Sequence, residues 1–80
     1  MKHRGSGNNM MFRALWGMRH ECLQYVEVGD EGVIHIRTNK VAQQLSMTSR
    51  QLRQSLLLAN ELKYIRELYV RYGRIHFKWL

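Results

Sequence analysis

Two arginines and two glutamines flank a leucine in the segment Ser49–Gln54, whose sequence is SRQLRQ. Arginine can donate two hydrogen bonds to the major-groove edge of guanine, and glutamine can form a similar pair with adenine. The pattern favours contact with base edges, although ordinary solvated residues of a helix would look the same, because both residue types favour helices. The candidate base contacts are Arg50, Gln51, Arg53 and Gln54, of which Arg53 lies nearer the buried side and also suits a phosphate.

A second group of side chains suited to a polyanion lies near the C-terminal end, where Arg71, Tyr72 and Arg74 surround Gly73. Glycine at this point predicts a tight turn, so these side chains would stand at the tip of a hairpin. A basic tip can follow the phosphate backbone or enter a narrow minor groove; the alternative is an exposed turn with incidental charge. Further candidates for phosphate contacts, each weak alone, are Asn39, Lys40, Thr48, Ser49, Lys2 and Arg4.

The charge of the chain is strongly positive and unevenly distributed. Its 80 residues carry a net charge of +7, and the isoelectric point is near 10.2. Four of the six acidic residues lie between Glu21 and Glu31, whereas residues 32–60 and 68–80 contain none. Such a field attracts polyanions, and both acid-free segments contain candidate contacts. The alternative is a solubility charge whose clustering is accidental.

Other features of the composition exclude several classes of protein. The single cysteine, Cys22, cannot close an internal disulfide, and its apolar surroundings predict a buried packing residue. No apolar segment is long enough to span a bilayer. Residues 1–9, MKHRGSGNN, lack the apolar core of a signal peptide. We therefore expect a cytoplasmic, nucleoid-associated protein with no membrane partner.

The N-terminal part predicts an arm followed by an amphipathic helix. Residues 1–9 are rich in basic, glycine and asparagine residues, which predicts a flexible basic arm or an expression-vector remnant. From about Met10 to Tyr25, apolar residues recur at helical spacing on a stripe that begins at Met11 and includes Cys22. The aromatic residues beside this stripe leave room for a second surface, which suggests a dimer contact through the first helix.

Two helices separated by a short turn are predicted in the middle of the chain. After a strand over Val33–Arg37, Thr38 is a candidate N-cap for a helix that ends near Leu45. The segment SMTS then interrupts the helical period, and Thr48 would cap a third helix that runs to about Asn60. Apolar residues at helical spacing predict the buried side of this helix: Leu52, Leu56 and Ala59, with Leu57 and Leu58 adding to the core.

After Asn60 the apolar period changes from that of a helix to that of a strand. Residues 62–70 and 74–80 fit two strands, joined by the turn RYG at 71–73. One face of the second strand is expected to be apolar, with Ile75, Phe77 and Trp79. The predicted order is therefore helix, strand, helix, tight turn, helix and hairpin.

Residues 33–79 resemble the winged helix-turn-helix domains of bacterial and phage DNA-binding proteins, among them small transcription regulators and phage replication or excision proteins. The matching features are a small residue in the second helix, a leucine before the turn, an apolar plug, a capping threonine and positions beyond it: Ala42, Leu45, Met47, Thr48, Leu52, Arg53, Leu56 and Ile65. The family often has glycine where this chain has Ser46, and usually has glycine where it has Lys63.

The resemblance implies an α+β winged helix-turn-helix fold for residues 10–80. Two helices crossed at a short turn hold the second one clear of the body, and a helix held in this way fits a major groove about 12 Å wide. The third helix would contact bases, while the second helix and the hairpin, or wing, would hold phosphates. The hypothesis is sequence-specific binding of double-stranded DNA in transcription regulation, or in phage or plasmid replication or recombination.

The alternative hypothesis is a winged-helix module that docks its basic face on an acidic protein without contacting bases; RNA binding is a third. Catalysis is not expected, because the sequence has no catalytic triad pattern, glycine-rich phosphate loop or paired carboxylates. The histidines and the cysteine lack the spacing of a metal site. We therefore expect no cofactor, no metal and no small-molecule substrate.

Overall fold

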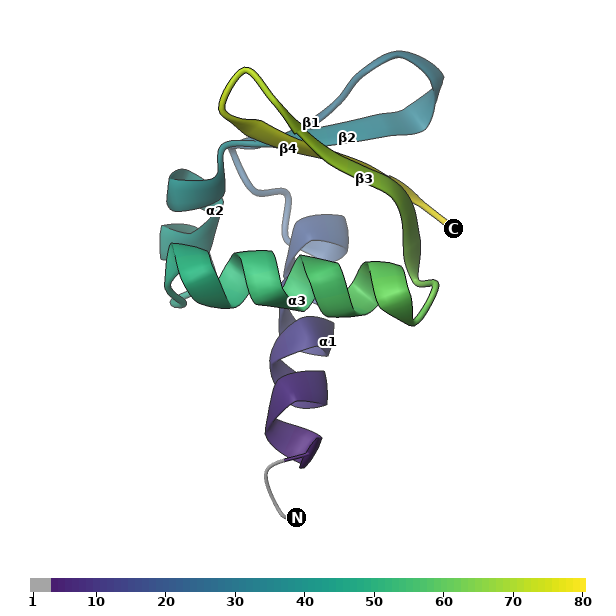
Figure 1. The fold of residues 1–80 in the computed structure, drawn as a ribbon. Coiled ribbons are helices and arrows are strands. Elements are labelled where there is room, and N and C mark those ends of the chain that lie inside the picture. Colours follow the sequence, from purple (N-terminus) through teal and green to yellow (C-terminus); the bar gives the residue numbers. More distant parts are fainter. Residues whose placement is uncertain (1–3) are drawn as a thin grey trace.

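Three helices pack against one face of a four-stranded antiparallel sheet in the computed structural model, which describes residues 4–80 (Figure 1). The predicted α+β class is confirmed. The strand order is β1-β2-β4-β3, so the C-terminal hairpin joins the sheet through β4. The elements are α1 (Arg4–His20), β1 (Val26–Val28), the 3-10 turn η1 (Asp30–Gly32), β2 (Val33–Ile36), α2 (Thr38–Gln44), α3 (Ser49–Glu61), β3 (Ile65–Arg71) and β4 (Arg74–Trp79).

The first helix is shifted toward the N-terminus relative to the prediction. It begins at Arg4 instead of near Met10, so positions 4–9 of the expected arm are helical, and residues 1–3 lie outside the described part. It ends at His20, and Cys22 beyond it has a φ of 50°. The prediction that Cys22 is buried is wrong, because the helix stops before its apolar stripe reaches this exposed side chain.

One face of α1 packs on the other helices. Its buried residues include Met11, Ala14 and Met18, at the spacing of one helical face. Gly17 lets α1 approach the end of α2 closely, because a Cβ at this position would collide with the side chain of Leu45. The low helix propensity of glycine is thus offset here by a close helix contact.

Strand β1 was not predicted. It pairs antiparallel with β2, with Val26 opposite Ile36, and the Gly29 N–H donates to the Val33 carbonyl at 2.7 Å to close the turn. The strand has only three residues, too few for an alternating pattern to be distinguished from the end of a helix followed by a loop.

The pair α2 and α3 follows the predicted spacing with one correction. Val41, Ala42 and Leu45 are buried, as expected. Thr38 is not the N-cap of α2: it is already the first helical residue, and the N-cap is Arg37, which makes no side-chain capping bond. The strand therefore ends one residue earlier than predicted, at Ile36.

The N-terminus of α3 is fixed by a reciprocal pair of hydrogen bonds. The predicted cap, Thr48, is confirmed: its Oγ1 accepts the Gln51 N–H at 3.0 Å, and the Thr48 N–H donates to Oε1 of Gln51 at 2.9 Å. This is a capping box, which satisfies two otherwise unpaired donors. The turn before it places Ser46 at a φ of 58°, a left-handed conformation that is uncommon for a residue other than glycine.

The buried side of α3 is partly as predicted. Leu52, Leu56 and Ala59 are almost completely buried, but Leu57 is 61% exposed, so its predicted burial is wrong. Leu57 follows Leu52 by five residues, which places it ~140° around the helix from that core position at 100° per residue. The helix also runs one residue further than expected, to Glu61.

The C-terminal hairpin closes with a two-residue turn at Tyr72 and Gly73. Both residues have positive φ, 54° and 72°, as a type I′ hairpin loop requires. On β4, Ile75 and Phe77 point into the core, as the alternation predicted. A register shift between Arg66 and Tyr69 interrupts the ladder with β3.

The core lies between the helices and the inner face of the sheet. Its largest fully buried side chains come from every layer: Phe77, Met11, Ile36, Leu45, Leu52, Leu56, Ile65 and Val41. Together they hold α3 against α1 on one side and β3 on the other. Within residues 4–80, none of the helices combines the length and the apolar character needed to cross a bilayer.

Replacing Thr48 with Ala is expected to lower the free energy of unfolding by ~1 kcal/mol, because the cap of α3 is lost. The measurement is urea denaturation followed by circular dichroism. Thr38→Ala removes the same hydroxyl from a position without a capping bond and should change stability by less than ~0.5 kcal/mol. Equal losses in the two variants would contradict the assignment of Thr48 as the cap and Thr38 as an ordinary first-turn residue.

Candidate nucleic-acid interface

The orientation of α3 decides which of the predicted contacts face outward. Its buried side faces the core. The opposite side carries a row of residues spaced at i, i+4, i+7 and i+11, which we call the outer row: Arg50, Gln54, Leu57 and Glu61. All four are exposed. The first two are among the predicted base contacts. The last two were not, and Glu61 introduces a carboxylate at the end of a helix that was expected to carry none.

Gln51 and Thr48 are engaged with each other and do not point freely outward. Gln51 is half-buried, and its Oε1 accepts the backbone N–H of Thr48. A two-bond contact with adenine needs both the oxygen and the nitrogen of the amide. Such a contact would therefore require the capping box to open, which leaves Arg50 and Gln54 as the better-placed candidates among the predicted base contacts.

A side-chain hydrogen bond joins the starts of the two helices. The hydroxyl of Ser49 donates to Oδ1 of Asn39, ten residues earlier in the chain. This bond ties the first turn of α2 to the first turn of α3. It therefore brings together Asn39 and Ser49, two of the predicted phosphate contacts. Asn39 also lines a cleft between α2, α3 and the hairpin.

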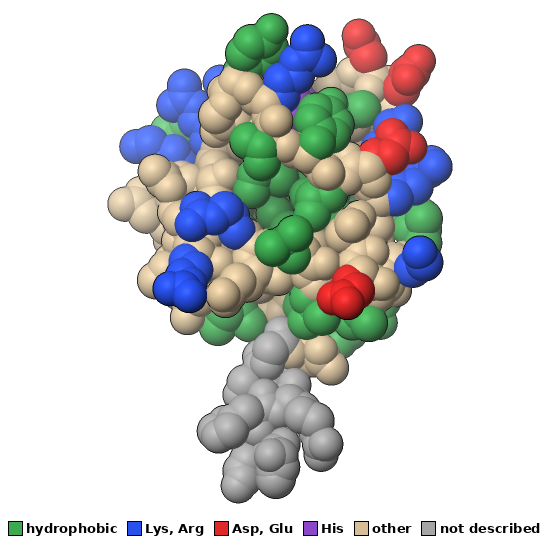
Figure 2. Space-filling view, viewed as in Figure 1, with side chains coloured by type: hydrophobic (Ala, Val, Ile, Leu, Met, Phe, Trp, Pro, Cys, Tyr) green, Lys and Arg blue, Asp and Glu red, His purple; other side chains and the backbone are tan. Residues whose placement is uncertain are grey.

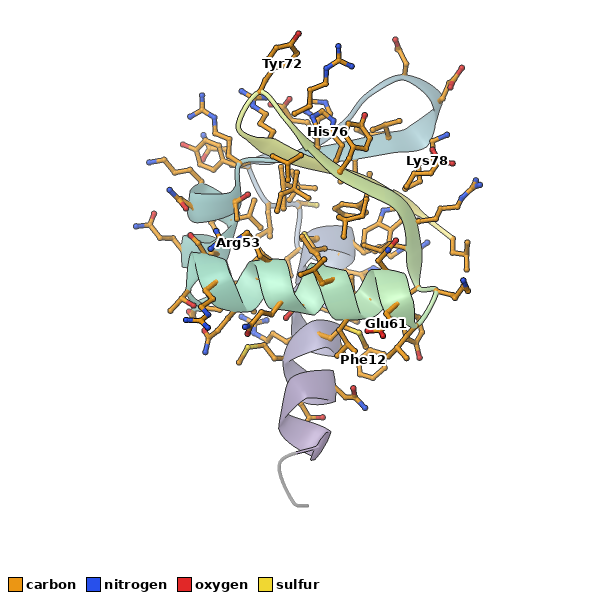
Figure 3. The ribbon with its side chains drawn as sticks, viewed as in Figure 1. Phe12, Arg53, Glu61, Tyr72, His76 and Lys78 are labelled. Carbon is orange, nitrogen blue, oxygen red and sulfur yellow. The ribbon has the colours of Figure 1, made fainter. Side chains whose placement is uncertain are left out.

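A basic cleft lies between the start of α2, the side of α3 and the hairpin. It has a volume of about 530 Å³ and is lined on three sides by cations from different elements. Figure 3 shows Arg53 on the side of α3 that faces the sheet, and Tyr72 projecting from the hairpin tip. The cations that line the basic cleft are Arg37, Lys40, Arg53 and Arg74.

The cations of the basic cleft are positioned in two ways. The Arg37 guanidinium and the Lys40 ammonium each lie 5.9 Å from the ring centroid of Tyr25, within the range of a cation–π contact. Arg74 is half-buried and lies 3.7 Å from the carboxylate of Glu27, which neutralises part of its charge. Among the described residues, no carboxylate lies within 4.0 Å of the charged groups of Arg37, Lys40 and Arg53.

The hairpin tip is the most exposed part of this surface. Tyr72 is 88% exposed, and the Arg71 guanidinium lies 5.2 Å from the centroid of its ring. Arg71 and Tyr72 therefore face solvent as predicted, whereas Arg74 turns back toward the sheet and the basic cleft. The tip also borders the basic cleft, because Tyr72 and Gly73 are among the residues that line it.

An apolar groove continues from the basic cleft along α3. It has a volume of about 260 Å³ and shares Arg53, Val70 and Ile75 with the cleft. Figure 2 shows hydrophobic side chains gathered in a hollow between α3 and the hairpin, and the acidic side chains visible on this face lie on the side away from α2. The other residues that line this apolar groove are Leu56, Leu57, Leu68 and Tyr69.

A second surface, rich in aromatic residues, lies on the first helix. Trp16 is 57% exposed there, and Phe12 packs edge-to-face on Tyr64 with their ring centroids 5.4 Å apart. The Arg19 guanidinium covers the ring of Trp79 at 4.7 Å. We call these side chains the aromatic patch; together they surround a pocket of about 210 Å³.

Two residues of this surface were not predicted from the sequence, one in the basic cleft and one in the apolar groove. Arg37 was counted as the last residue of a strand, but the strand ends before it and it lines the cleft. Its position next to Thr38 at a strand-to-helix junction was a usable signal. Leu57 was assigned to the core, although its spacing from Leu52 and Leu56 places it on the outer row of α3.

A scan against protein-family models, a search of curated proteins and a search of solved structures each gave no match to this chain. The chemistry of the surface is therefore the basis for assigning a function. It combines four cations, amide and hydroxyl groups, and an adjoining apolar groove.

If the basic cleft holds the phosphates of a duplex, replacing Arg53 with Gln should weaken the binding of duplex DNA and make it less dependent on salt. Each phosphate contact contributes ~0.9 to the magnitude of the slope of log K against log salt concentration. Loss of the one contact made by Arg53 should therefore reduce that magnitude by ~0.9. The measurement is fluorescence anisotropy over a salt series. Arg66→Gln is the matched control, because Arg66 is paired with Glu67 at the far end of β3. An unchanged slope for Arg53→Gln would remove this side chain from the interface.

Proposed function

We propose that this chain is a winged helix-turn-helix protein that binds double-stranded DNA in a sequence-specific way. The order of its elements supports the family, as does a sheet in which β4 lies between β2 and β3. A further support is the backbone at Ser46 and Lys63, with φ of 58° and 70°. These are the two positions where the family commonly has glycine, and glycine is the residue that adopts positive φ most readily.

The single observation that carries the proposal is the convergence of the basic cleft and the outer row of α3 on one surface. Arg53 lines the cleft, and Arg50 and Gln54 lie on the adjoining outer side of the same helix. In this arrangement the outer row enters the major groove, where it can contact base edges. The cations of the cleft hold the phosphates that border the groove.

The hairpin acts as the wing in this proposal. Arg71 and Tyr72 at its tip extend the basic surface beyond the cleft, where they contact the backbone or the minor groove next to the site of α3. The protein binds DNA without catalysing a reaction, so it would serve as a regulator, or as the DNA-binding part of a phage or plasmid replication or recombination system.

The apolar groove favours a second candidate function, docking of a protein partner. A groove lined almost entirely by carbon accommodates the apolar side chains of a peptide, and the neighbouring basic cleft would hold acidic residues of the same peptide. Such a module would bind through the same face without base contacts. The two functions differ in their dependence on Arg50, which lines neither the groove nor the cleft.

We also propose that the aromatic patch on α1 joins two copies of the chain. Exposed aromatic side chains of this kind are enriched at protein interfaces, and the patch includes residues from α1 and from the region around β4. In two-fold symmetric DNA-binding proteins the two reading helices lie on successive turns of the duplex, and a dimer of this chain would present two copies of α3.

Selection of bound fragments from random duplex DNA should yield a defined site, and Arg50→Ala should lose preference for it. The difference in binding free energy between the selected site and a scrambled duplex should fall by ~1–3 kcal/mol, because one two-bond contact with a base is removed. Arg66→Ala serves as the control of equal charge. If selection gives no consensus, base contact by α3 is excluded and the protein-docking function is favoured. If a consensus exists but Arg50→Ala binds both duplexes as the wild type does, Arg50 is not a base contact.

Trp16→Ala should shift the protein toward the monomer in sedimentation equilibrium, because it removes the largest exposed ring of the aromatic patch. Loss of a central aromatic contact weakens association by ~2 kcal/mol or more, which corresponds to a dissociation constant at least about 30-fold higher. Tyr72→Ala, which removes an exposed ring from the hairpin tip, should leave association unchanged. A wild-type protein that stays monomeric at all accessible concentrations rules out this dimer.

A further inference from the structure

Leu57 is an exposed apolar residue of α3 that lines the apolar groove beside the basic cleft. It is 61% exposed on the outer row of α3, one turn beyond Gln54. Across the apolar groove, Val70 on β3 is 69% exposed. A single exposed leucine needs no explanation, but here exposed apolar side chains line both walls of one groove. A continuous apolar surface is therefore exposed to solvent next to the basic cleft.

The length of the outer row matches a few base pairs. From Arg50 to Leu57 the helix rises ~10 Å at 1.5 Å per residue, which equals about three base-pair steps of 3.4 Å. If α3 lies along the groove and Arg50 contacts one base pair, Leu57 lies near the edge of a base pair about three steps away. In the major groove, the apolar group that a base presents is the 5-methyl of thymine.

We infer that Leu57 determines specificity by packing against the 5-methyl group of a thymine, about three base pairs from the base that Arg50 contacts. This inference rests on the proposed DNA-binding function and names the feature of the target that the apolar part of α3 selects. Val70 borders the same groove from the wing side and limits the access of water to the contact.

The surroundings of Leu57 favour a base edge over a phosphate. Glu61 lies one turn further along the same exposed row, and its carboxylate disfavours an approach of the phosphate backbone at that end. Figure 3 shows Glu61 near the C-terminal end of α3, away from Arg53. The cations that suit phosphate contacts lie in the basic cleft, toward the other end of the helix.

The test uses the duplex obtained by selection and replaces its thymines one at a time with deoxyuridine. Uracil lacks only the 5-methyl group and keeps the hydrogen-bonding pattern of thymine. For the wild-type protein, one replacement should raise the dissociation constant about three- to fivefold, the change that corresponds to ~0.8 kcal/mol for one buried methyl-sized group. The measurement is anisotropy at constant salt concentration.

Variants at Leu57 identify the side chain that senses this methyl group. Leu57→Ala should bind the thymine duplex about three- to fivefold more weakly than the wild type and should not distinguish it from the uracil duplex. Leu57→Gln, which keeps the length but not the apolar character, should behave in the same way. Leu62→Ala removes another exposed leucine outside the groove and should retain the full wild-type difference. Urea midpoints verify that every variant is folded.

Three outcomes overturn the inference. If the wild type binds its selected site but is indifferent to every uracil replacement, Leu57 has no methyl contact, while the proposed function stands. If Leu57→Ala still distinguishes thymine from uracil, another residue makes the contact. If the protein binds no duplex with preference, the proposed function fails and the inference fails with it; a peptide partner in the apolar groove is then the remaining explanation for this surface.

Discussion

The constraint on which the whole surface depends is the burial of one side of α3. Leu52, Leu56 and Ala59 are held against α1 and the sheet, and the capping box at Thr48 fixes where the helix starts. With 3.6 residues per turn, burial of these positions forces Arg50 and its row to face outward. The rotation of the helix is therefore set by core packing, and the chemistry of the exposed side follows from it.

The basic cleft is assembled from segments that lie far apart in the sequence. The β2–α2 junction provides Arg37 and Lys40, α3 provides Arg53, and the hairpin provides Arg74. Each cation alone would be an ordinary surface residue of small effect. Most of these cations have no carboxylate beside them, so together they produce a positive local field that attracts a polyanion. Glu27 reduces this field only beside Arg74, on the side of the sheet.

Sequence patterns predicted those parts of the fold in which apolar residues recur with a clear helical or strand period, or in which a capping residue marks the start of a helix. The cap at Thr48, the buried row of α3 and the inward face of β4 all followed from spacing and residue type. The end of α1 did not, because left-handed backbone at Cys22 ends the helix while the apolar spacing continues. The strand Val26–Val28 has only three residues and is defined by its pairing with β2, which a local pattern does not show. The N-cap of α2 was misplaced because Thr38 is a residue type that favours the cap but lies one position inside the helix. Leu57 was predictable from its position around the helix, whereas the cleft required the three-dimensional arrangement of three segments.

Amide chemical shifts, followed while the labelled protein is titrated with its selected duplex, report directly which surface binds DNA. The largest shifts should fall in Arg37–Lys40, Ser49–Leu57 and Arg71–Arg74, while β1 and the exposed side of α1 around Trp16 change little. Shifts confined to the aromatic patch, or spread evenly over the whole domain, would show that the outer side of α3 and the basic cleft do not form the binding surface.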